Sequence, residues 1–202
     1  MSDDGIPSPT EYIPIPDDHY AALGRVADAW ADLEFEIDQL IWQLLQVPQA
    51  LGACVTAQMI SIHPRLRALR ALVRLYEISE PIQKTLGGFA GEAHALAEKR
   101  NRTIHDKRLM WAKSREVVRF QVTADTKLIF GPQAESIGAL NEFTATIRSM
   151  MERFLRIRDE IENELRSSPD KRRAPLPHIA RWRGTPYSDS QPPPPPPEPS
   201  QG

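Results

Sequence analysis

Hydrophobic residues recur at alternating intervals of three and four along two long stretches of the chain. The first stretch, from about Asp17 to Val47, contains Leu23, Val26, Trp30, Leu33, Ile37, Leu40 and Leu44. The second, from about Pro132 to Arg166, has the same spacing over Ile137, Leu140, Ile147, Met151, Phe154, Ile161 and Leu165, with the polar residues Thr144 and Arg158 at two of its positions. This interval places the side chains on one face of an α-helix. We therefore predict two long helices, each about 45 Å long at ~1.5 Å per residue, that pack as neighbours.

Three shorter stretches between them are also expected to be helical. Residues 49–60 are small and apolar and predict a buried helical turn or short helix. Residues 64–79 carry one apolar face, made by Leu66, Leu69, Val73 and Tyr76. Residues 81–106 carry another, made by Ile82, Leu86, Phe89, Ala93 and Leu96. Within this last stretch, Gly87-Gly88 is expected to be a weak point or a kink.

One stretch breaks the helical pattern. The β-branched and aromatic runs Val117–Val122 and Lys127–Phe130 are separated by four residues and predict a small hairpin. An isolated hairpin is marginally stable, so this one is expected to lie on the helices. The predicted fold class is all-α: an up-and-down bundle of four to five helices, with a small β-hairpin insertion before the last long helix.

Proline placement predicts the domain boundaries. Four prolines precede Asp17, eleven lie from Pro169 onward, and only Pro48, Pro64, Pro81 and Pro132 fall between. Because proline excludes the helical conformation from the residue before it, these four should mark helix starts or joints. We predict a disordered N-terminal arm over residues 1–16, a helical bundle domain over 17–168 and a disordered proline-rich tail over 169–202.

The tail carries two features of its own. The run from Pro192 to Pro197 predicts polyproline II or disorder, so it is either a spacer or a ligand for the aromatic groove of a protein partner. A basic patch around Trp182 contains Arg172, Arg173, Arg181 and Arg183. This patch is either a solvated linker or a contact for RNA or an acidic partner.

Composition narrows the class of protein. Hydrophobic residues make up 41% and charged residues 26% of the chain, a normal globular mixture, and the formal net charge is −2. Bulk charge therefore does not favour nucleic acid, and any such contact has to come from a local basic cluster. Cys54 is the single cysteine, which excludes an internal disulfide and is typical of a cytoplasmic chain. No secretory signal or membrane-spanning run is seen, so no contact with a membrane is expected.

The candidate chemistry lies at the end of the third predicted helical stretch. The apolar face of residues 82–96 continues to Arg100, so an arginine stands where a core leucine is expected. Asn101 and His105 are four residues apart and share a neighbouring face. Burying such groups costs several kcal/mol unless they are paired or used. Either Arg100 pairs with an acid of another helix while Asn101 and His105 cap the helix end, or the three form a functional site.

The segment from Arg100 through Asn101 to His105, inside a helical bundle of this size, resembles the motif of the HEPN superfamily. The resemblance implies a metal-independent endoribonuclease without a cofactor, in a toxin–antitoxin or phage-defence setting. It assigns proton transfer to His105 and phosphate binding to Arg100, with Asn101 assisting. It also implies a homodimer in which two motifs form one cleft. In one toxin branch a tyrosine stands two residues after the histidine, whereas this chain has Lys107.

The superfamily also has members that do not cleave RNA, so a non-catalytic helical scaffold or RNA-binding protein stays open as the alternative. Flanking cations Arg102, Lys107 and Arg108 are the predicted RNA-binding residues. A further row consists of Arg67, Arg70 and Arg74, for which ion pairing with Glu34, Glu36, Asp159 or Glu162 is the ordinary alternative. No phosphate-binding glycine loop, metal-ligand spacing or nucleophile elbow is present, so no metal site is predicted.

Overall fold

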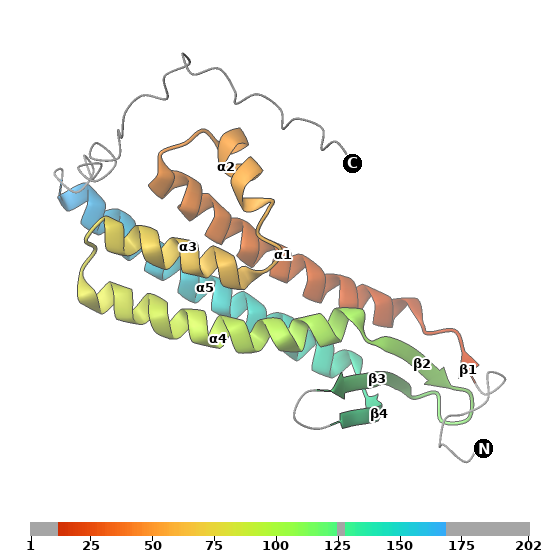
Figure 1. Cartoon of the computed structure of the whole chain (residues 1–202). Helices are drawn as coiled ribbons and strands as arrows, with labels where there is room; N and C mark the ends of the chain where they lie inside the picture. Colours follow the sequence, from red (N-terminus) through yellow and green to blue (C-terminus); the bar gives the residue numbers. More distant parts are fainter. Residues whose placement is uncertain (1–11, 125–127, 169–202) are drawn as a thin grey trace, which may run out of the picture.

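The computed structural model describes residues 12–124 and 128–168, and this part of the chain is mostly helical with a small antiparallel sheet (Figure 1). The helices are α1 (Asp17–Leu45), α2 (Gln49–Thr56), α3 (Ile62–Leu75), α4 (Glu80–His105) and α5 (Ile137–Ser167). The strands are β1 (Tyr12–Ile13), β2 (Lys107–Trp111), β3 (Val117–Ala124) and β4 (Leu128–Ala134). No helix in the described ranges is long and apolar enough to cross a membrane.

The core lies between α1, α3, α4 and α5, and its main members come from the apolar faces seen in the sequence. On α1, Leu33 and Ile37 are fully buried, as are Ile147 and Phe154 on α5. Phe89 of α4 meets Phe154 with ring centroids 5.5 Å apart, which joins α4 to α5. Full burial of each such side chain stabilises the fold by about 1.5–3 kcal/mol. The prediction of two long helices with these buried faces is confirmed.

The expectation that residues 49–60 form a buried apolar segment is wrong for the larger side chains of helix α2. Leu51 and Val55 are 60% and 49% exposed, whereas Gly52 and Thr56 are buried. The reason is Trp42 of α1: a Cβ built on Gly52 would lie 2.4 Å from the Trp42 ring. The Trp42 indole also donates a hydrogen bond to Thr56 Oγ1 at 3.1 Å. Only the small face of α2 fits against this ring, so its larger apolar residues face outward.

The predicted hairpin is present as β3 and β4, but it is half of a larger sheet with the strand order β1-β2-β3-β4. Leu109 of β2 lies opposite Val118 of β3, and these pairings are antiparallel throughout. The mostly helical class is therefore confirmed, but the predicted hairpin insertion is a four-stranded sheet. The expectation that a helix begins near Pro132 is also wrong, because Pro132 lies in β4 opposite Phe120. An edge strand tolerates proline, since an amide on its outer side needs no partner.

The other helix boundaries lie close to the positions predicted from the prolines. Helix α4 begins at Glu80 with Pro81 in its first turn, and it runs through Gly87-Gly88 without interruption. Helix α5 begins only at Ile137, where the Ser136 hydroxyl accepts a hydrogen bond from the Ala139 amide at 3.1 Å. Such a hydroxyl cap satisfies one of the free amides of a helix start.

The ends of the chain are described only in part. Tyr12 and Ile13, inside the arm predicted over residues 1–16, pair with Trp111 and Met110 of β2. The rest of that arm, and the tail with its basic patch and proline run, lie outside the described residues.

Candidate functional site

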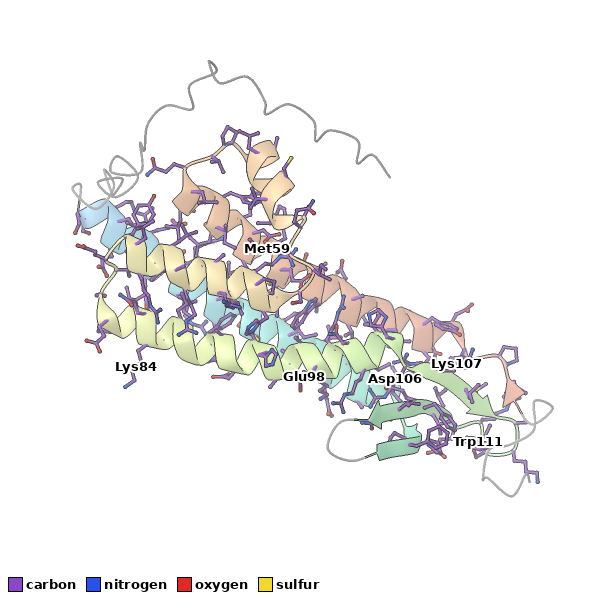
Figure 2. The ribbon with its side chains drawn as sticks, viewed as in Figure 1. Met59, Lys84, Glu98, Asp106, Lys107 and Trp111 are labelled. Atoms are coloured by element: carbon purple, nitrogen blue, oxygen red, sulfur yellow. The ribbon has the colours of Figure 1, made fainter. Side chains whose placement is uncertain are left out.

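The motif lies where α4 meets the sheet. Helix α4 ends at His105, and the chain passes through Asp106 directly into β2 at Lys107 (Figure 2). A helix end leaves backbone carbonyls without partners. Here the Arg108 guanidinium donates hydrogen bonds to the carbonyl oxygens of Thr103 and, at 3.1 Å, of Asp106. Arg108 therefore closes the end of the helix that carries the motif.

Arg108 belongs to a partly buried group of charges that we call the Glu135 cluster, consisting of His19, Asp106, Arg108, Arg119 and Glu135. Arg108 Nε donates to Glu135 Oε2 at 2.6 Å, and His19 Nε2 lies 3.1 Å from the same oxygen. Arg119 is 3.8 Å from Glu135 and 3.7 Å from Asp106. The cluster joins the start of α1 and strands β2 and β3 to the short link between β4 and α5.

The Glu135 cluster holds Arg108, which was predicted from the sequence as an RNA-binding residue. Arg108 is buried, with its side chain 6% exposed, and its guanidinium is used by Glu135 and by the two carbonyls. A buried charge with these partners is a structural element, because breaking such a pair leaves an uncompensated charge. We therefore leave Arg108 out of the RNA-binding set proposed below.

Arg100 lies at the edge of the core, half-buried. Its guanidinium carbon is 5.9 Å from the centre of the Trp30 ring of α1, and its Nη1 donates to Asn101 Oδ1 at 3.1 Å. Among the described residues no carboxylate lies within ion-pair distance of Arg100, and its buried Nε has no hydrogen-bond partner. The ion pair that one reading of the sequence expected here is therefore not formed.

His105 is exposed and lines a shallow surface depression of about 510 Å³. The other lining residues are Asp106, Lys107, Leu109, Phe120, Val122 and Phe130. Phe120 and Phe130 meet edge to face, with ring centroids 5.6 Å apart. The depression thus combines an imidazole and an ammonium group with an aromatic floor supplied by the sheet.

The sequence pattern missed the aromatic part of this site. Phe120 and Phe130 were visible only as strand-forming residues. Their partners in the sheet show what the sequence did not: Phe120 lies opposite Lys107, and Phe130 lies opposite Val122. Cross-strand neighbours share a face of the sheet, so the register places both rings on the face that carries Lys107, two residues after His105.

The remaining motif residues are accessible to different degrees. Asn101 and Lys107 are exposed, and Arg102 is half-buried. Within the described ranges neither Arg102 nor Lys107 forms an ion pair with a carboxylate. An imidazole transfers protons near neutral pH, and guanidinium and ammonium groups bind phosphate. Exposed aromatic rings stack on nucleobases. These are the chemical elements of a site for a nucleotide chain.

The row of arginines on α3 is not paired with the acids that the sequence offered as its partners. The acids expected to pair with Arg67, Arg70 and Arg74 have other partners: Glu34 lies near Arg65, and Glu36, Asp159 and Glu162 surround Arg158. No described carboxylate is within ion-pair distance of the three arginines. The expectation that these acids neutralise the row is therefore wrong.

In the ranges 12–124 and 128–168, no three histidine, cysteine or carboxylate side chains gather as metal ligands would. Comparison of the chain with protein-family models, with curated proteins and with solved structures finds no match.

Proposed function

We propose that this protein is a HEPN-like, metal-independent endoribonuclease. The observation that supports it best is the placement of His105. The imidazole is exposed, lines a depression with an aromatic floor, and is preceded by Arg100 and Arg102 and followed by Lys107, cations without a carboxylate partner in the described structure. A proton-transfer group, phosphate-binding groups and a surface for base stacking thus occur within one small region.

Each residue has a chemical role in this proposal. A base stacks on Phe120 and Phe130, and Lys107 and Arg102 bind the adjoining phosphates. His105 takes the proton from the ribose 2′-hydroxyl, whose oxygen then attacks the phosphorus. The bond to the 5′-oxygen breaks, that oxygen takes up a proton, and a 2′,3′-cyclic phosphate remains. Arg100, oriented by Asn101, stabilises the charge on the phosphate oxygens.

The resemblance to HEPN proteins extends the proposal to assembly and setting. We propose a homodimer whose motif-bearing helices face each other, so that two copies of the motif share one cleft. The cellular setting that we propose is a toxin–antitoxin or phage-defence system acting on cytoplasmic RNA. The tail beyond residue 168 is the proposed contact for a protein partner.

The second candidate is a non-catalytic scaffold or RNA-binding protein. The observation that favours it is the state of Arg100, whose guanidinium is hydrogen-bonded to its neighbour Asn101 and lies over Trp30. An arginine used in this way contributes to packing through its cation–π contact.

Incubation with tRNA and with total RNA, in the presence of a chelator, separates the two candidates. We expect the wild-type chain to cleave, and His105→Ala to cleave at least about 100-fold more slowly, as is typical for loss of a general base. Arg100→Ala should also lose activity. Lys84→Ala is the control, because Lys84 is an exposed residue at the other end of the same helix and belongs to no part of the proposed site. If wild type and both motif variants leave RNA equally intact, the scaffold reading replaces the nuclease.

A further inference from the structure

Helix α3 has an unusual distribution of charge. It carries Arg65, Arg67, Arg70 and Arg74 and no acidic residue. Arg65 is fully used inside the protein, with its Nε 2.9 Å from Asp38 and its Nη1 bound to the Met59 carbonyl. The other three have no carboxylate partner in the described structure. At ~1.5 Å per residue they follow one another on one face at about 4.5 and 6 Å.

These arginines lie along the contact between α3 and α4. Figure 1 shows α3 beside the first half of α4, with the second half of α4 continuing to the sheet. Arg70 and Arg74 line a small crevice with Gln83. A Cβ on Gly87 would be 3.8 Å from Arg70 Nη2, so the guanidinium lies over a position without a side chain. Further along, the rings of His63 and His94 are 5.1 Å apart.

The face of α4 that meets this row leads to the candidate site. Gln83, Gly87, His94, Asn101 and His105 follow one another at intervals of four and seven residues. At ~100° per residue, these intervals keep all five within about 40° of one another around the helix. The distance along the axis from Gly87 to His105 is about 27 Å. The arginine row and the catalytic histidine therefore share one side of the molecule.

We propose that Arg67, Arg70 and Arg74 form a phosphate track, which binds the backbone of an RNA strand along the contact between α3 and α4 and leads it to His105. The inference rests on the proposed function for the identity of the ligand. A span of about 27 Å accommodates roughly eight nucleotides at ~3.4 Å per nucleotide of a stacked strand. RNA is favoured over an acidic protein because the track is continuous with the exposed histidine and its aromatic depression. All three cations are guanidinium groups, which bind phosphate through paired hydrogen bonds.

One acidic residue opposes the track and provides a test of its own. Glu98 is exposed on α4 between His94 and Asn101, and its carboxylate is 3.9 Å from the His94 ring. A strand that follows the track passes this negative charge. Glu98→Gln should therefore bind RNA more tightly at low salt, by roughly two- to fivefold. A gain in affinity cannot result from misfolding.

The experiment measures binding of a fluorescently labelled single-stranded RNA to the full chain carrying His105→Ala, which prevents cleavage. On this background, Arg67→Gln, Arg70→Gln and Arg74→Gln together should weaken binding at least about tenfold near 0.1 M salt. The slope of log affinity against log salt should fall by about 2, because each phosphate contact contributes ~0.7 for a single strand. The matched control removes three exposed arginines elsewhere, Arg115, Arg148 and Arg156, and should change affinity less than twofold.

The outcomes separate the track from the nuclease. The track is overturned if the track variant and the control variant lose RNA affinity equally. It is also overturned if the track variant binds RNA as tightly as its parent. If wild type cleaves RNA while the track variants bind and cleave normally, the track is wrong and the nuclease stands. If the track variants lose binding although wild type never cleaves, the track stands and the nuclease fails. Binding of polyglutamate but not of RNA, dependent on the same arginines, overturns the inference in favour of an acidic protein.

Discussion

The Arg108 guanidinium lies 2.6 Å from the Glu135 carboxylate, with the two side chains only 6% and 9% exposed. This pair joins the strand that follows α4 to the short link between β4 and α5. Because Arg108 also binds the Thr103 and Asp106 carbonyls, it holds the last turn of α4. The direction of the exposed His105 thus depends on a buried ion pair formed three residues later in the chain.

Replacing Arg108 should therefore lower the stability of the fold, which replacing a residue that only binds RNA would not do. We expect Arg108→Ala to lower the free energy of unfolding by about 3–5 kcal/mol, because it leaves Glu135 buried with less compensation. Denaturant unfolding measures this change. Arg156→Ala, at an exposed position on α5, should stay within about 0.5 kcal/mol of wild type. Similar stability of the two variants would contradict the structural role given to Arg108.

Two glycines on neighbouring helices should respond oppositely to alanine. A Cβ on Gly52 would lie 2.4 Å from the buried Trp42 ring, so Gly52→Ala should destabilise the protein by about 1–3 kcal/mol through overpacking. Gly24 lies inside α1 with no atom within 4 Å of such a Cβ. Gly24→Ala should stabilise by about 0.5–1 kcal/mol, because alanine favours the helix. Thermal unfolding of both variants tests this, and a Gly52→Ala variant as stable as wild type or more stable would show that α2 is not packed against Trp42.

The pair formed by Glu92 on α4 and Arg153 on α5 predicts a small dependence of stability on pH. The hydrogen bond from Arg153, with its charge, lowers the pKa of Glu92 below its usual value. A carboxyl whose folded pKa lies below its unfolded pKa stabilises the fold above the unfolded pKa. That stability is lost as the pH falls through the folded pKa. Because both side chains are about half exposed, the loss should be at most about 1 kcal/mol.

This dependence is measured as the difference in unfolding free energy between wild type and Glu92→Gln. The difference should be present near pH 7, shrink through the acidic range and be reduced by molar salt. Glu152→Gln, which changes an exposed glutamate on α5, is the control. A difference that stays constant from neutral to acidic pH would show that the ion pair makes no net contribution.

The proposed dimer predicts a mass of twice the 22.8 kDa chain. Light scattering at tens of micromolar protein should give this value for wild type. The His105→Ala variant should have the same mass. His105 is proposed to lie in the cleft between the two chains, so its loss should not change how the chains pack. A strictly monomeric mass at these concentrations would contradict the shared cleft, and cleavage would then have to occur within one chain.

Much of the fold was predictable because it depends on local pattern. The apolar faces that contain Leu33 and Phe154 follow the helical period, and a helix with such a face has to bury it. The hairpin also follows from β-branched and aromatic residues close together in the chain. The motif itself, from Arg100 to His105, lies at the end of a helix as expected.

Other features depend on pairings that no local pattern contains. Strand β2 is short and begins directly after a helix, and it is a strand because β3 and β1 pair with it. Arg102, Arg108 and Arg67 look alike in the sequence, yet only Arg108 meets Glu135, 27 residues further along. The number of acids near an arginine in space decides whether it is buried and paired or free for a ligand. Local pattern therefore determined the helices and the position of the motif. Tertiary structure decided which cations remain without acid partners and which aromatic rings stand beside His105, because both depend on residues distant in the chain.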